Sequence, residues 1–185
     1  AFPLVGTMAA LQEEHFQGAD MPTIDPSLRA GKVTKWGEWV KSKPLVVNGV
    51  ESRWRILGKY DLVSTNEDGT IGLIDCKVSD SQRDSGQFYS PQLEAYAYAL
   101  ENPAAGKAQS VASMGLLVWR PTTAIGSNAD EYGFGVMQKY VPVERDQANF
   151  LKVIGEFIEV LEGELPDAGS ECQTCTYLTA RNALD

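Results

Sequence analysis

The sequence predicts an α/β fold in which a central mixed β-sheet is flanked by α-helices. Segments with helical periodicity occur near both ends of the chain and once in its middle, and apolar, β-branched runs bounded by turn residues lie between them. The order is helix, three or four strands, helix, two strands, helix, which suits a sheet covered by helices. With 185 residues, 43% of them hydrophobic, the chain is expected to form one domain over residues 1–185.

The first half of the chain predicts one helix followed by a hairpin. Residues 4–17 are expected to be helical, because Leu4, Met8 and Leu11 recur at helical spacing. The segment "KWGEWVKSK" is interpreted as a short helix. Asn48-Gly49 separates two strand-like runs and is a typical hairpin turn.

The next elements alternate between strand and helix. The stretch "IGLIDCKVS", residues 71–79, follows the turn "NEDG" and is expected to be a largely buried strand. Residues 90–102 are expected to form a helix with Ser90 as its N-cap and Pro91 in its first turn.

The last elements are two strands and a long helix. Residues 114–120 and 132–143 are expected to be strands joined by a loop over residues 121–131. Residues 145–163 carry an apolar stripe at helical spacing and predict an amphipathic helix.

The buried strand carries the residues that point to chemistry. Asp75 and Lys77 are two apart, so they share one face of the strand. Asp61 lies on the preceding strand, and the short connection predicts an antiparallel pair in which the two carboxylates converge. Paired carboxylates favour a divalent cation such as Mg²⁺ or Mn²⁺, beside which a lysine can orient water or stabilise charge on a phosphate. The alternative is an exposed ion pair at a sheet edge.

These residues resemble the metal-binding core of the PD-(D/E)XK nuclease superfamily. "PQLEAY" adds Gln92 and Tyr96, four apart on one helix face, and resembles the Q-x-x-x-Y element of the RecB-like and CRISPR-associated branch. "GTMAALQEEHF" resembles that branch's opening helix, in which G-T-x-x-H is followed by a glutamate. Here Ala10 stands in place of the histidine, and Glu14 falls near the glutamate position.

The resemblance implies a restriction-endonuclease-like fold and a Mg²⁺- or Mn²⁺-dependent nuclease, expected to be an exonuclease that acts on single- or double-stranded DNA. It implies Asp61, Asp75 and the carbonyl of Cys76 as metal ligands, with Glu14 as a supporting ligand. Lys77 would position the attacking water, and the Gln92–Tyr96 pair would hold the nucleic-acid backbone or the water. RNA as a substrate and endonuclease action stay open. A second possibility is a catalytically inactive binding module, and a third is an unrelated interaction protein with a chance motif.

The cysteines do not complete the motif that the resemblance suggests. "CQTCTYLTAR" resembles the cysteine motif of the branch, but Arg181 stands where a third cysteine is expected. Cys172 and Cys175 supply two thiolates, which complete neither a cluster nor a tetrahedral zinc site, so no iron–sulfur cluster is expected. With only three cysteines and no transmembrane run, a reducing, cytoplasmic location in a bacterial or phage-infected cell is expected.

Charge is distributed unevenly along the chain. The net charge is −9, which alone disfavours a nucleic-acid partner, yet half of the sixteen cationic residues lie within residues 29–59. Five of them are candidate phosphate contacts: Lys32, Lys35, Arg53, Arg55 and Lys59. Trp36, Trp39 and Trp54 could stack on bases of a single strand, although core packing is the alternative. The acidic remainder suggests a protein partner or a larger complex.

Overall fold

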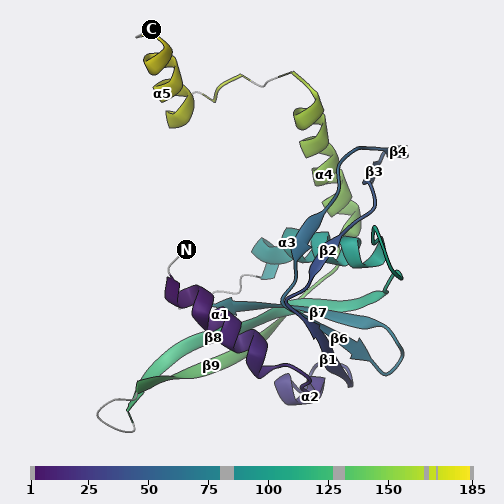
Figure 1. Cartoon of the computed structure of the whole chain (residues 1–185), viewed down its shortest axis with the longest axis vertical. Coiled ribbons are helices and arrows are strands. Elements are labelled where there is room, and N and C mark those ends of the chain that lie inside the picture. Colours follow the sequence, from purple (N-terminus) through teal and green to yellow (C-terminus); the bar gives the residue numbers. More distant parts are fainter. Residues whose placement is uncertain (1–2, 80–85, 127–131, 165–166, 170, 184–185) are drawn as a thin grey trace.

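The structure is a computed structural model that describes residues 3–79, 86–126, 132–164, 167–169 and 171–183 (Figure 1). The helices are α1 (Pro3–His15), α2 (Met21–Ile24), α3 (Gly86–Glu101), α4 (Gln147–Glu162) and α5 (Gln173–Asn182). The strands are β1 (Gly31–Trp36), β2 (Trp39–Lys41), β3 (Val46–Val47), β4 (Val50–Glu51), β5 (Leu57–Lys59), β6 (Leu62–Asn66), β7 (Ile71–Val78), β8 (Val111–Gly126) and β9 (Tyr132–Val143).

The central sheet is mixed, as the sequence predicts. Its strand order is β1-β6-β7-β8-β9, in which β7 and β8 run parallel and the other neighbours are antiparallel. The parallel pair needs a crossover, and α3 supplies it. Two short antiparallel pairs, β2–β5 and β3–β4, stand outside this sheet. The fold is therefore α/β with helices on a mixed sheet, which is consistent with a restriction-endonuclease-like core.

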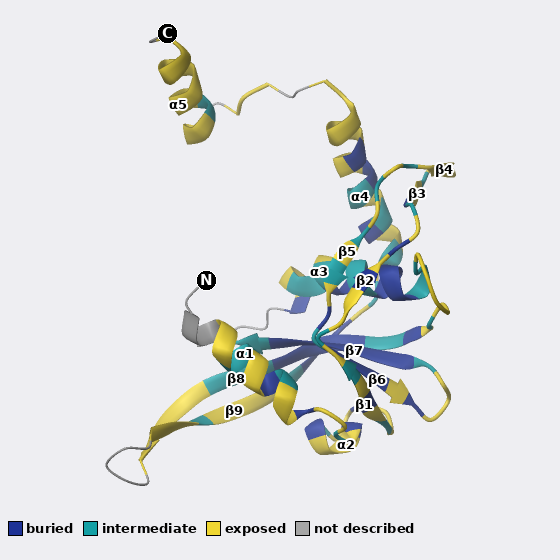
Figure 2. Ribbon diagram, in the orientation of Figure 1, coloured by how far each residue is buried: buried dark blue, intermediate teal, exposed yellow. Residues whose placement is uncertain are grey.

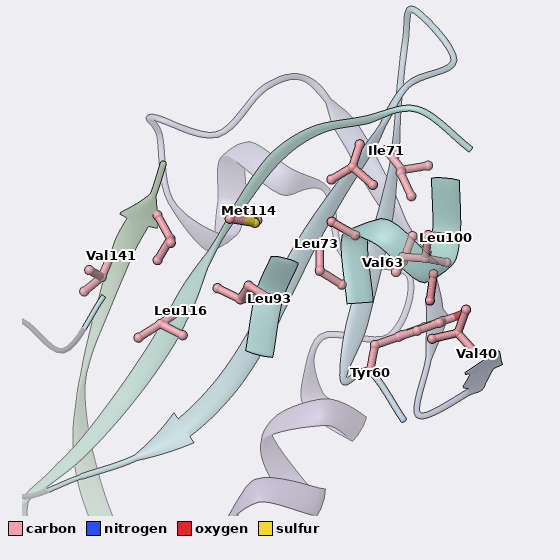
Figure 3. Close-up of a cluster of buried hydrophobic side chains, with 14 residues drawn as sticks. Val40, Tyr60, Val63, Ile71, Leu73, Leu93, Leu100, Met114, Leu116 and Val141 are labelled. Carbon is pink, nitrogen blue, oxygen red and sulfur yellow. The ribbon is translucent and has the colours of Figure 1, made fainter. Parts of the chain in front are cut away.

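Apolar side chains fill the space on both faces of the sheet. On one face, Leu93 and Ala97 of α3 pack with Leu73 and Leu116 of the sheet (Figure 3). A second buried cluster lies on the other face of the sheet. It includes Phe16, which follows α1, and Met21 and Ile24 of α2. Because Leu73 and Ile74 are consecutive in β7 and point to opposite faces, both faces of this strand are buried.

Several predicted elements are confirmed. β7 and β9 lie where the apolar runs predict strands, and α4 lies within residues 145–163. Asn48 and Gly49 connect β3 to β4 with φ angles of 52° and 77°, as a tight hairpin turn of this residue pair requires.

The short helix expected over "KWGEWVKSK" is wrong. Trp36 ends β1 and Trp39 begins β2, and Gly37 between them has a φ of 58°. A left-handed backbone angle interrupts a right-handed helix, and glycine adopts it without steric cost. The four-residue spacing of Trp36 and Val40 imitates a helical period, although both segments pair as strands.

Two other boundaries differ from the prediction. α3 begins at Gly86, so Pro91 lies inside the helix and Ser90 is not its N-cap. β8 continues to Gly126 instead of ending at Arg120, and it pairs with β9 over that extension. The extension projects beyond the sheet and is exposed, as is α5, which lies apart from the sheet in this view (Figure 2). None of the helices in the described parts of the chain is long and apolar enough to cross a membrane.

Candidate active site

The antiparallel pairing of β6 and β7 brings the two predicted aspartates to the same level of the sheet. Leu62 pairs with Ile74, so Asp61 directly precedes one partner and Asp75 directly follows the other. Asp61 Oδ2 accepts a hydrogen bond of 2.7 Å from the backbone N–H of Cys76. The backbone of β7 therefore fixes the Asp61 carboxylate next to Asp75.

The environment of Asp61 disfavours its charged form. Burial and the neighbouring charge of Asp75 raise the pKa of Asp61 to about 7, and Glu13 adds to this effect. The hydrogen bond from Cys76 and the charge of Lys77 oppose it. A carboxylate crowded by like charges favours either a proton or a cation beside it.

Asp75 and Lys77 form a close ion pair on one face of β7. Lys77 Nζ lies 2.5 Å from Asp75 Oδ2, and the two side chains are 24% and 3% exposed. Burial raises the pKa of Asp75, although Lys77 lowers it. Burial lowers the pKa of Lys77, but Asp75 and Asp61 outweigh burial and the net shift is upward, so the lysine is an ammonium. The same ammonium lies 4.6 Å from the ring centroid of Tyr89 in α3.

A third carboxylate, Glu13 of α1, interacts electrostatically with Asp61 and Asp75. Burial and the charge of Asp75 raise the pKa of Glu13, whereas Lys59 lowers it. Glu14, which the sequence proposes as the supporting ligand, is exposed. The difference arises because Gln12 is fully buried and donates a hydrogen bond of 2.7 Å to the carbonyl of Leu117 in β8. Gln12 and Phe16 are both buried and four residues apart, so they mark the side of this segment that packs on the sheet. Glu13 is half-buried, whereas Glu14 is exposed.

The link between β1 and β2 lies against the same cluster. Gly37 donates a hydrogen bond of 2.8 Å to the carbonyl of Asp61. A Cβ at Gly37 would lie 3.2 Å from Glu13 Oε2 and 3.5 Å from Lys59 Nζ. The absence of a side chain at Gly37 therefore lets the carboxylate of Glu13 and the ammonium of Lys59 approach this turn.

The Gln92–Tyr96 pair is formed within α3. Gln92 Nε2 donates a hydrogen bond of 3.0 Å to the Tyr96 hydroxyl, which the four-residue spacing makes possible. The Tyr96 ring packs directly on Gly58 of β5, where a Cβ would lie 2.5 Å from a ring carbon. The pair thus lies over the strand that carries Lys59.

The candidate phosphate contacts are placed in different surroundings. Lys32 pairs with Asp20 at 3.5 Å, and Arg53 pairs with Glu162 at 3.4 Å, so acidic residues from elsewhere partly neutralise both. Arg55 donates to the carbonyl of Ser42, and Lys35 is half-buried in β1. Of these five residues, Lys59 is the one that lies beside the carboxylate cluster.

The three tryptophans of residues 29–59 also differ in how far they are buried. Trp54 is half-buried against an apolar cluster that includes Tyr98 of α3 and Phe150 of α4, and its Nε1 donates a hydrogen bond of 3.0 Å to Glu162. Trp36 and Trp39 are 39% and 70% exposed. Core packing therefore accounts for Trp54 and leaves Trp39 unexplained.

The cysteines lie in two separate places. Cys76 is buried in β7 among the apolar side chains on the α1 face of the sheet. Cys172 is the N-cap of α5, and its Sγ accepts a hydrogen bond of 3.4 Å from the backbone N–H of Cys175. In Figure 1, α5 is distant from β7, so the thiol of Cys76 is not a neighbour of the pair.

The donor set beside Lys77 fits a hard divalent cation. Among the described residues, no three side chains of His, Cys, Asp or Glu already form a metal-binding group. Mg²⁺ and Mn²⁺, however, need only one or two carboxylates and complete their shell with carbonyls and water. Asp75 Oδ2 is buried, and Lys77 is its ion-pair partner among the described residues. Such an oxygen suits a cation.

A groove between α3 and α4 is a separate feature. It has a volume of about 520 Å³ and is lined by apolar side chains of α4, such as Phe150 and Phe157, and by polar ones such as Gln92 and Glu94. Neither aspartate of the candidate site nor Lys77 lines it. The chemistry-bearing cluster therefore lies outside this groove.

The chain thus combines a mixed sheet flanked by helices with one aspartate just before β6, a second within β7 and a lysine two residues beyond the second. This arrangement is that of a restriction-endonuclease-like α/β fold. The model of the PD-(D/E)XK nuclease superfamily matches residues 9–180. The chain belongs to this superfamily. A solved structure titled "Crystal structure of SSO0001" is 14% identical, with a TM-score of 0.49, and the match covers 95% of this chain and 67% of that one. The search of curated proteins found no sequence that matches.

Proposed function

We propose that the protein is a Mg²⁺- or Mn²⁺-dependent nuclease that hydrolyses phosphodiester bonds of DNA, acting as an exonuclease of the RecB-like branch. Membership of the superfamily supports a nuclease. The observation that carries the proposal is the grouping of Asp61, Asp75 and Lys77 at one level of β6 and β7.

The proposed ligands are the carboxylates of Asp61 and Asp75 and the backbone carbonyl of Cys76, with Glu13 as the supporting carboxylate. A divalent cation bound there supplies Lewis acidity toward the scissile phosphate and lowers the pKa of a water. The ammonium of Lys77 orients the attacking water and stabilises negative charge that develops on the phosphate. Tyr89 keeps Lys77 in place through its ring face.

Residues around this centre would bind the substrate. Lys59 adds positive charge next to the carboxylates, and the hydrogen-bonded Gln92–Tyr96 pair orients the nucleic-acid backbone or the water from α3. We expect Lys32, Lys35, Arg53 and Arg55 to contribute to phosphate binding farther away. A cytoplasmic location and a protein partner remain part of the proposal.

Replacing Lys77 with alanine tests the proposal. The lysine acts on the transition state and not on the ground state, so cutting of labelled single-stranded and duplex DNA with Mn²⁺ should fall about 100-fold or more while DNA binding is retained. Lys107→Ala, at an exposed loop lysine, is the matched control and should cut like the wild type. Unchanged cutting by Lys77→Ala would reject the mechanism.

One observation favours the alternative of an inactive binding module. Ala10, at the position of the expected metal-binding histidine, is exposed and has no donor atom. An inactive module predicts that wild type and Lys77→Ala both bind DNA and that neither cuts it with either metal.

A further inference from the structure

The two-stranded ribbon β2–β5 presents a mixed aromatic and cationic face to solvent. Trp39 pairs with Lys59 and Lys41 pairs with Leu57, and directly opposed residues of an antiparallel pair share a face. All four are exposed, with Trp39 at 70% and Leu57 at 63%. On the opposite face, Val40 is buried in the core and Gly58 packs on Tyr96.

This face is continuous with the carboxylate cluster. Trp36 and Trp39 flank the turn whose Gly37 lies against Glu13 and Lys59 and donates to the carbonyl of Asp61. Lys59 belongs both to the ribbon face and to the surroundings of Glu13. The exposed indoles therefore lie on the segment that leads directly away from the proposed site of chemistry.

Charge and shape favour a specific occupant. A flat exposed indole between lysines is suited to a nucleobase whose own phosphates pair with the ammonium groups. The acidic residue in this turn is Glu38, and its Oε2 accepts a hydrogen bond of 2.8 Å from the Tyr60 hydroxyl, which holds this carboxylate against Tyr60. In a duplex the base faces are stacked on each other, so only an unpaired base can use such a platform.

We propose that the β2–β5 ribbon is a stacking platform for unpaired nucleotides, with Trp39 as its main aromatic residue, and that it makes single-stranded DNA the preferred substrate. This inference rests on the proposed function, because it names the substrate class of the same site. Trp36, which is 39% exposed, provides a second, smaller stacking surface on the other side of Gly37.

The test is binding in the absence of divalent metal. Anisotropy of a labelled oligothymidine and of a blunt DNA hairpin is measured in EDTA, so that no cleavage is needed for the readout. Trp39→Ala should weaken binding of the single strand about tenfold and leave hairpin binding within about twofold, and Trp39→Phe should retain most of the single-strand affinity. Tyr132→Ala, which removes an aromatic side chain that is 78% exposed on the distant β9 arm, is the matched control and should behave as wild type.

The experiment distinguishes a failed stacking platform from a failed nuclease assignment. Equal single-strand affinity of wild type and Trp39→Ala, an equal loss for both DNA forms, or no single-strand binding by the wild type would overturn the platform, even if the protein cuts DNA. Conversely, a selective loss in Trp39→Ala together with no cutting by the wild type in Mn²⁺ would support the platform and reject the nuclease. The thermal midpoint of each variant shows whether the fold is retained.

Discussion

The carboxylates of Glu13, Asp61 and Asp75 interact electrostatically with one another and with the ammonium groups of Lys59 and Lys77. Burial raises the pKa of each of the three acids. In the metal-free protein this means that negative charge at the site opposes folding. A cation bound at this site would offset that unfavourable charge.

The pH dependence of stability tests the electrostatics of Asp61. Its pKa is about 7 in the folded protein and near 3.8 in the absence of perturbation, so the folded state binds the proton more tightly. Stability should therefore decrease as pH rises through this window. In EDTA, Asp61→Asn should be more stable than wild type at pH 8, and the difference should shrink toward pH 4.5, as measured by thermal unfolding.

Asp68→Asn is the control for this prediction. Asp68 lies in an exposed turn, and hydrogen bonds from Thr70 lower its pKa, which is the opposite direction. Its replacement should not stabilise the protein at pH 8. A lower unfolding temperature of Asp61→Asn than of wild type at pH 8 would mean that the carboxylate is not crowded as described.

Among the elements, α3 contributes Tyr89, Gln92 and Tyr96, and contacts at its junction with α4 keep it in place. Glu94 of α3 is 1% exposed, and Arg145, just before α4, donates to both of its oxygens at 3.1 Å. Arg145 also donates to Glu101 and to the carbonyl of Val111 in β8. The guanidinium of Arg145 thus connects the start of α4 with α3 and with β8, the strand that runs parallel to β7.

Arg145→Met should destabilise the protein strongly. The substitution leaves the buried carboxylate of Glu94 without its cation, and breaking a buried pair in this way costs about 3–5 kcal/mol. The measurement is the urea unfolding midpoint, with Lys152→Met, at an exposed lysine of α4, as the matched control. Similar midpoints for the two variants would show that the guanidinium is not needed to hold the junction.

At the scale of the whole molecule, local patterns predicted most of the fold. The apolar runs of β7 and β9 and the amphipathic stripe of α4 are short-range patterns, and they were predictable for that reason. The antiparallel pairing of β6 and β7 followed from a short turn, so the two aspartates could be expected to meet.

Features that depend on tertiary packing could not be predicted in this way. The choice between Glu13 and Glu14 depends on how α1 docks, and buried Gln12 fixes this by donating to a carbonyl of the sheet. Trp36 and Val40 are four residues apart, as on a helix face, although they lie on two strands. The positive φ of Gly37 between them interrupts the helix that this spacing suggests. The exposure of Trp39 depends on which face of β2 is covered by α3, which no local pattern specifies.

We propose that the carboxylates of Asp61, just before β6, and Asp75, in β7, hold one divalent cation beside Lys77. Calorimetric titration of the protein with Mn²⁺ tests it most directly, using wild type and Asp75→Asn, which preserves the size of the side chain. Wild type should show a saturable binding event that is lost or greatly weakened in the variant, while circular dichroism shows that the fold is retained. Identical titration curves for the two proteins would contradict it.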